Sequence, residues 1–215
     1  MKRNACIVMA LAAILLAAAA DLAAAPSARK TQFTLRAGLN LFQASGGEGD
    51  YVAGANDFPV TPAHQAPAAG IGLTFAGKGS LAFGLDVQYG LAATVDLRDP
   101  SDGENIQAET PAGFLAVLRL TRFIPLSQSL RLAVFLGGGG EFRMGGDQEF
   151  VSSLGNRIVL EAPEKPFSPL AAAGAALQVQ LSPAMGLALE LRGAYLFRDP
   201  AVLLVTPSLG LVLGF

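Results

Sequence analysis

Residues 31–42 have the sequence TQFTLRAGLNLF, in which apolar and polar side chains alternate. Alternation at every second position corresponds to 180° per residue, which is the period of a β-strand with two different faces. The apolar face consists of Phe33, Leu35, Ala37, Leu39 and Leu41. The other face consists of Gln32, Thr34, Arg36, Gly38 and Asn40. The stretch therefore predicts a strand that is apolar on one side and polar, with one charge, on the other.

The same period recurs along the rest of the chain and gives eight segments in total. The other seven are 67–77, 81–91, 110–122, 130–143, 167–182, 187–198 and 203–215. Each has about 11 to 15 residues, whereas a strand in a soluble protein averages about 5 to 6. A tilted strand needs about 9 to 11 residues to cross a bilayer. The segment lengths therefore favour strands that cross a membrane.

The connections between these segments alternate between long and short. The long ones, which are polar and rich in Gly, Pro or Asp, are 43–66, 94–109 and 144–166, while 199–202 is abbreviated. The short ones are 77–80, 123–129 and 182–186. Outer-membrane barrels have short periplasmic turns and longer external loops, and an even number of strands puts both chain ends in the periplasm. The sequence therefore predicts an all-β fold, an eight-stranded antiparallel up-and-down transmembrane β-barrel over residues 31–215.

The composition excludes several other classes of protein. The chain has 215 residues, of which 52% are hydrophobic, and a net charge of −2, so it is too apolar to be disordered. A pI of about 5.4 predicts no nucleic-acid partner, because phosphate binding needs an excess of Lys and Arg. The single cysteine, Cys6, cannot form an intramolecular disulfide. The Gly137–Gly140 run lacks a phosphate-loop lysine, and no cofactor or metal is predicted.

The first 25 residues have the pattern of a secretory signal peptide. Lys2 and Arg3 form a basic start, residues 5–20 are apolar and uncharged, and small residues suitable for cleavage occupy the region 20–28. An uncleaved anchor helix is the alternative, but the apolar stretch is short for a span and rich in Ala. We therefore expect residues 1–25 to be a signal peptide, cleaved between 20 and 28.

Closure explains how such strands can enter a membrane, because lipid cannot satisfy the backbone groups of a free sheet edge. The apolar face then contacts lipid and the polar face turns into a lumen that, at eight strands, side chains can just fill. The predicted lumen charge cluster, with a structural role, consists of Arg36, Asp86, Arg119, Arg131, Glu141, Glu190 and Arg192. The neutral polar residues predicted beside it are Asn40, Gln88, Gln178 and Gln180.

The four positive and three negative groups of this cluster can largely neutralise one another. A mutually bonded cluster tolerates burial, whereas a lone buried charge is costly. We therefore expect a plug of ion pairs, with a polar path for ions as the alternative. The competing fold is a soluble ligand-binding barrel, in which apolar side chains line the interior and charged residues such as Arg36 and Glu190 lie outside.

Proline positions agree with the barrel, because a missing N–H costs least at the end of a strand. Pro67, Pro111 and Pro169 fall at the expected starts of even-numbered strands, and Pro125 falls in a short turn, as does Pro183. Pro207 is the exception, since it lies inside the last segment. A local distortion of the strand pairing is therefore expected at that position.

The last predicted strand carries an alternating apolar series that consists of Leu209, Leu211, Leu213 and Phe215. With this series, its signal peptide and its eight amphipathic strands, the chain resembles the small outer-membrane β-barrel proteins of Gram-negative bacteria, the OmpA/OmpX-like group. In that family such a series is the carboxy-terminal insertion signal, which the barrel-assembly machinery recognises. The resemblance implies a monomer delivered by periplasmic chaperones and surrounded by membrane lipids and lipopolysaccharide. Because Trp is absent and Tyr occurs three times, phenylalanines are expected at the membrane interfaces.

Some barrels of similar architecture modify lipid A with a Ser, a His and an acid near the external rim. His64, the only histidine and expected in the first long loop, would be the general base here. The nucleophile would be one of Ser45, Ser101, Ser152 and Ser153. No spacing selects among these serines, and a shared fold does not imply a shared activity. The sequence therefore predicts no enzyme.

The three long connections carry formal charges of about −3, −4 and −2. Such charge keeps a crowded surface soluble. A site for divalent cations at Asp96, Asp99, Asp102 and Glu104 is the alternative, although the spacing differs from a calcium-binding loop. The sequence thus predicts an integral outer-membrane protein, structural or surface-interacting, with a filled lumen and acidic external loops. A narrow channel, or a carrier for small or hydrophobic molecules, is the alternative.

Overall fold

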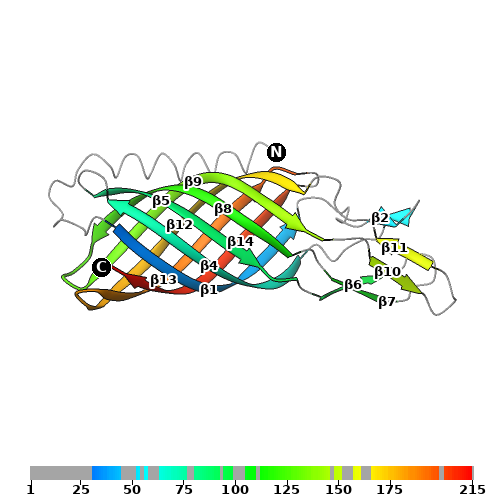
Figure 1. Cartoon of the computed structure of the whole chain (residues 1–215), viewed down its shortest axis with the longest axis horizontal. Helices are drawn as coiled ribbons and strands as arrows, with labels where there is room; N and C mark the ends of the chain where they lie inside the picture. The colour runs from blue at the N-terminus through cyan, green and yellow to red at the C-terminus, as the bar shows by residue number, and fades with distance from the viewer. Residues whose placement is uncertain are drawn as a thin grey trace.

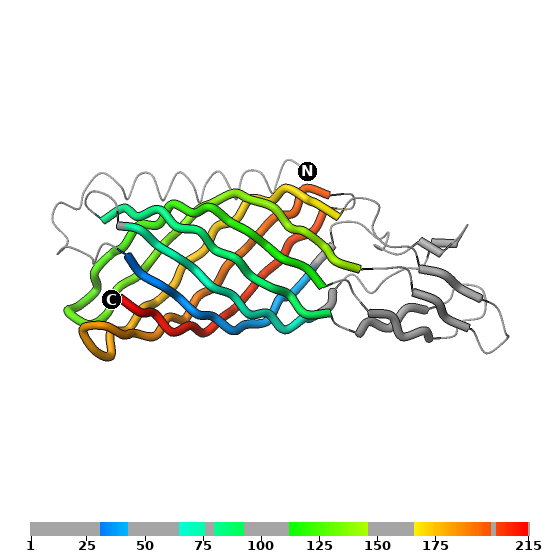
Figure 2. Tube along the Cα trace, in the orientation of Figure 1, coloured from blue at the N-terminus to red at the C-terminus, as the bar shows by residue number. Residues whose placement is uncertain are grey.

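A computed structural model describes residues 31–44, 52–53, 56–57, 63–76, 80–92, 94–98, 105–109, 112–145, 148–151, 157–160, 166–198 and 201–214. Eight long strands form a closed barrel, in which each strand pairs antiparallel with the next and the last pairs with the first. They are β1 (Thr31–Ala44), β4 (Ala63–Ala76), β5 (Leu81–Gly90), β8 (Ala112–Pro125), β9 (Leu130–Met144), β12 (Phe167–Ser182), β13 (Met185–Leu196) and β14 (Val202–Leu213). Figure 1 shows the strands tilted around the long axis, and Figure 2 shows β1, in blue, beside β14, in red. The predicted barrel is confirmed.

The long connections contain three small two-stranded sheets that the sequence pattern does not predict. They pair β2 (Val52–Ala53) with β3 (Asn56–Asp57), β6 (Thr94–Arg98) with β7 (Asn105–Glu109), and β10 (Gln148–Val151) with β11 (Arg157–Leu160). All three belong to connections that leave one end of the barrel, here named the hairpin end (Figure 1). The short connections β8–β9 and β12–β13 and the carboxy-terminal end of β14 lie at the other end, here named the turn end (Figure 1). No helix within the described ranges is long and apolar enough to span a membrane.

The apolar face of each strand points outward, as predicted. Leu85 and Leu191 have 41% and 57% of their surface exposed, whereas Arg36 and Glu190 have 8% and 5%. This is the reverse of a soluble barrel, in which the leucines would be buried together. The arrangement suits lipid, because hydrocarbon solvates apolar side chains and the closed sheet pairs its own backbone groups.

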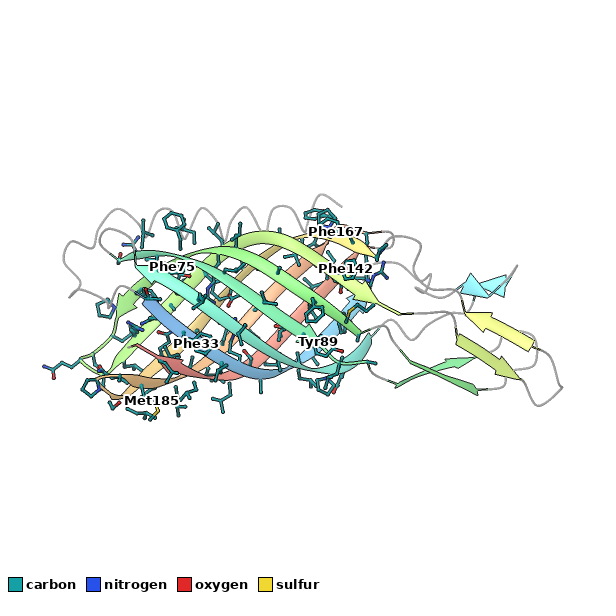
Figure 3. The ribbon with its side chains drawn as sticks, in the orientation of Figure 1. Phe33, Phe75, Tyr89, Phe142, Phe167 and Met185 are labelled. Carbon is teal, nitrogen blue, oxygen red and sulfur yellow. The ribbon has the colours of Figure 1, made fainter. Side chains whose placement is uncertain are left out.

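Aromatic side chains gather toward both ends of the barrel exterior. Phe75 lies toward the turn end, while Tyr89, Phe142 and Phe167 lie toward the hairpin end (Figure 3). Tyr89 also packs against Phe114, with ring centroids 4.8 Å apart. Outer-membrane barrels carry aromatic girdles at the two membrane interfaces. In the described part of the chain, phenylalanine supplies most of these rings.

The strands extend further toward the hairpin end than the apolar pattern indicates. β4 begins at Ala63 rather than at residue 67, so Pro67 lies inside a strand and not at its start, which corrects the prediction. His64 likewise belongs to β4, opposite Phe42, and not to a loop. Backbone pairing continues there although the side chains no longer alternate in polarity. Pro125 is likewise the last residue of β8, not part of a turn.

The pairing between β1 and β14 is interrupted at Pro207. Gly38 pairs with Ser208 and Leu41 pairs with Val205, but the two residues between them have no pairing with β14. The register is the same on both sides of the gap, so the ladder is broken without being shifted. A proline has no N–H to donate, and the gap lies where the sequence predicts a distortion.

Candidate functional site

An arginine bound by two acids occupies the middle of the lumen. Arg36, on β1, donates from Nη1 to Oε1 and Oε2 of Glu190 on β13, at 2.9 and 2.7 Å. Its Nη2 donates to Oδ1 of Asp86 on β5. All three side chains are buried. The geometry satisfies both ends of the guanidinium, which is the condition under which buried charges are tolerated.

A second arginine, Arg119 on β8, joins the same two acids. Its Nη1 lies 2.8 Å from Oδ2 of Asp86 and 3.5 Å from Oε2 of Glu190. Its Nη2 donates to the hydroxyl of Thr74 on β4 at 3.0 Å, and its guanidinium carbon lies 5.3 Å from the centre of the Phe135 ring. We call Arg36, Asp86, Arg119 and Glu190 the central ion network. It connects four strands across the lumen.

Glycines provide the space in which this network lies. A Cβ on Gly72, in β4, would collide with Oδ1 of Asp86 and would lie 3.2 Å from Nη2 of Arg36. A Cβ on Gly210, in β14, would lie 2.8 Å from Cγ of Arg36. The inward positions next to the charged side chains therefore have to be small.

Gly72→Ala is expected to destabilise the barrel by about 1–3 kcal/mol, because the added methyl group displaces an ion pair that cannot move into solvent. Gly138→Ala is the matched control, since Gly138 is exposed on the outside of β9 and its Cβ would approach nothing closer than 3.7 Å. Equilibrium urea unfolding in lipid vesicles measures the free energy of unfolding of both variants. Equal effects of the two substitutions would contradict this account of Gly72.

The structure does not bring all seven residues of the predicted cluster together. Arg131 lies toward the turn end, where its Nε donates to Oε1 of Gln178 at 2.8 Å and its guanidinium carbon lies 4.5 Å from the Phe123 ring centre. Glu141 lies toward the hairpin end and accepts a hydrogen bond of 3.4 Å from Arg198. The alternation along a strand indicates whether a residue faces the lumen or the outside. The position of that residue along the barrel axis depends on the register between strands, which the alternation does not give.

A neutral polar group lies next to the central ion network. Oδ1 of Asn40, on β1, accepts hydrogen bonds from Nε2 of Gln88 at 2.6 Å and from the hydroxyl of Thr206 at 2.8 Å. Asn40 and Gln88 are among the residues predicted for the lumen, whereas Thr206 is not. Gln180 lies at the end of β12 and donates to the carbonyl of Ser182 at 3.1 Å.

Apolar side chains fill the lumen on the hairpin side of the central ion network, and the sequence does not predict them there. The group, here named the apolar layer, consists of Leu115, Val117, Leu170, Ala172, Ala194, Leu196, Val202 and Leu204, with Phe42 packed against it. In β13, Ala194 and Leu196 follow Arg192 at every second position, so they occupy the same face. This position at every second residue from Arg192 is the signal that could have predicted the apolar layer from the sequence.

Other predicted residues lie outside the site or outside the described residues. Leu209 and Leu213 of the expected insertion signal are exposed on β14, and Leu211 is half-buried on the same face. The following predicted positions fall outside the described residues: the signal peptide at 1–25, Phe215, Ser45, Ser101, Ser152, Ser153, Asp99, Asp102 and Glu104. The side chains of His64 and Asp96 are likewise not described. Within the described ranges, no three His, Cys, Asp or Glu residues gather as metal ligands.

A closed eight-stranded antiparallel barrel with an apolar exterior and an ionic lumen is the fold of the small outer-membrane β-barrels. Among solved structures, the chain is similar to Neisserial surface protein A (NspA), with a TM-score of 0.57 and 10% identity over 88% of this chain and 100% of that one. The Pseudomonas aeruginosa outer-membrane protein OprG matches with a TM-score of 0.48 and 10% identity, over 87% of this chain and 97% of that one. No protein-family model and no curated protein matches the chain.

Proposed function

We propose that this protein is an integral outer-membrane barrel with a permanently filled lumen, and that its role is structural or surface-interacting. The observation that carries the proposal is the pair of barriers across the lumen, namely the central ion network and the apolar layer beside it. Ions would have to break buried, hydrogen-bonded ion pairs and then cross an apolar constriction. Both steps are costly in a lumen of eight strands.

The orientation follows from the asymmetry of the connections. Outer-membrane barrels carry short turns on the periplasmic side and long loops outside. The hairpin end, with its acidic connections, would face the cell exterior, and both termini would lie in the periplasm. Lipopolysaccharide and membrane lipids would surround a monomer, which the barrel-assembly machinery and periplasmic chaperones would deliver.

The closed lumen predicts the behaviour of the protein in planar lipid bilayers. The purified barrel is expected to show no steady conductance above that of lipid alone, because the two barriers block the passage of ions. A gel of unboiled and boiled samples controls for folding, since a folded barrel shifts its mobility on heating. A steady open state that Arg131→Gln or Arg192→Gln abolishes would contradict the proposal and support the narrow channel.

The proposal includes no catalytic step. Its test is mass spectrometry of lipid A from cells with and without the protein. We expect the same acyl pattern in both. A pattern that changes with the protein and reverts with His64→Ala would overturn this part of the proposal.

A further inference from the structure

One buried arginine in the lumen has donors that the central ion network does not use. Arg192, on β13, has 2% of its surface exposed. Among the described residues, neither Nε nor Nη1 of Arg192 has a hydrogen-bond partner. Unpaired buried donors of a charged group are costly, because the group has lost its hydration without replacement.

The charges around Arg192 do not balance. Arg192 and the central ion network together contain three arginines and two carboxylates, a net charge of +1. Both carboxylates are already bound by Arg36 and Arg119, which also repel Arg192. Glu190 and Asp86 also attract Arg192, but two carboxylates shared among three arginines leave one buried positive charge without a counter-charge.

The unpaired polar atoms near Arg192 are also N–H donors, so the group that they lack is a hydrogen-bond acceptor. Nδ2 of Asn40 and Nε of Arg119 have no partner among the described residues. Asn40 cannot reverse its amide without loss, because its Oδ1 accepts from Gln88 and Thr206. Thr206 is the direct cross-strand neighbour of Arg192. This part of the lumen therefore has an excess of both positive charge and N–H donors.

We propose that the lumen binds one small monovalent inorganic anion, of the size of chloride, at the guanidinium of Arg192. Such an anion accepts several hydrogen bonds and cancels the net charge. A water molecule would satisfy donors but would leave the charge uncompensated. Along β13 the site lies between Glu190 of the central ion network and Ala194 of the apolar layer, so the anion exchanges only when one of these two barriers opens. The small lumen excludes larger anions.

Bromide replaces chloride and is located by anomalous scattering. Crystals of the detergent-solubilised barrel grown with sodium bromide are expected to show an anomalous peak within hydrogen-bond distance of the Arg192 guanidinium. The peak should be absent in Arg192→Met. No peak at Arg192 in the wild-type protein would overturn the proposal, whether or not the variant folds.

The second test compares sodium chloride with sodium gluconate at equal ionic strength, since gluconate is too large for the lumen. An anion that binds only the folded barrel stabilises it by mass action. Chloride is expected to raise the temperature at which half of the folded gel band is lost by about 3–6 °C. Arg192→Met should remove this shift. Arg131→Gln, which changes a lumen arginine outside the site, should retain it.

A third variant replaces the anion with a fixed carboxylate. In Thr206→Asp the new side chain faces Arg192 across the strand pair, at a distance that allows cross-strand contact. This variant should be insensitive to chloride. A wild-type protein equally stable in both salts would overturn the proposal and leave water as the partner of Arg192. A chloride shift that persists in Arg192→Met would also overturn it, because chloride would then act at another site.

Discussion

Glu190→Ala is expected to destabilise the barrel by about 3–5 kcal/mol, the largest loss for any single change in the lumen. Both carboxylate oxygens of Glu190 accept from Nη1 of Arg36, at 2.9 and 2.7 Å, and its Oε2 lies 3.5 Å from Nη1 of Arg119. Its removal leaves Asp86 as the one acid among three buried arginines. The arginines cannot reach solvent, so the excess charge stays buried.

The double variant Glu190→Ala, Arg36→Met is the control for this prediction. It restores the net charge of the wild-type lumen and replaces the stranded arginine with an apolar side chain of similar length. Equilibrium urea unfolding in lipid vesicles is expected to show that the double variant regains most of the lost stability. If the double variant were as unstable as Glu190→Ala alone, the loss would not come from an uncompensated charge.

Leu191→Arg is expected to cost about 2–4 kcal/mol, because the new charge faces hydrocarbon near the middle of the membrane. Leu191 has 57% of its surface exposed and lies midway along β13, between Ala175 and Pro207 of the neighbouring strands. The same urea titration in vesicles measures the loss.

Leu213→Arg is the matched control, with the same change at an outward position at the end of β14. A charge near the interface costs only about 0–1 kcal/mol. A loss at Leu213 equal to that at Leu191 would contradict the proposed position of the barrel in the membrane. If neither substitution lowered the free energy of unfolding, the two leucines would not face lipid.

The face of each residue could be predicted from the sequence, whereas its partners could not. Alternation alone puts Arg36 and Glu190 inside and Leu191 outside, because a strand repeats every two residues. Arg36 and Glu190 are 154 residues apart, and their contact depends on the register and tilt of strands that no local pattern encodes. For the same reason, the separation of Arg131 and Glu141 from the central ion network could not be foreseen.

The apolar layer was missed for a different physical reason. The expectation of a polar lumen leaves out Leu115 and Leu204, although their positions in the alternation place them inside. A lumen filled by side chains needs no water, and apolar residues can complete its packing. The three hairpins were missed because strands of 2 to 5 residues are too short to show a period.

The central ion network also has a consequence for the assembly of the barrel. β1, β5 and β8 bring together two arginines and one acid, and the second acid arrives only with β13. In a half-built cylinder Arg36 and Arg119 therefore share the one carboxylate of Asp86 until β13 adds Glu190. Contacts between strands so distant in the chain form late and together. Folding should thus be cooperative, and partly assembled intermediates should be too unstable to accumulate.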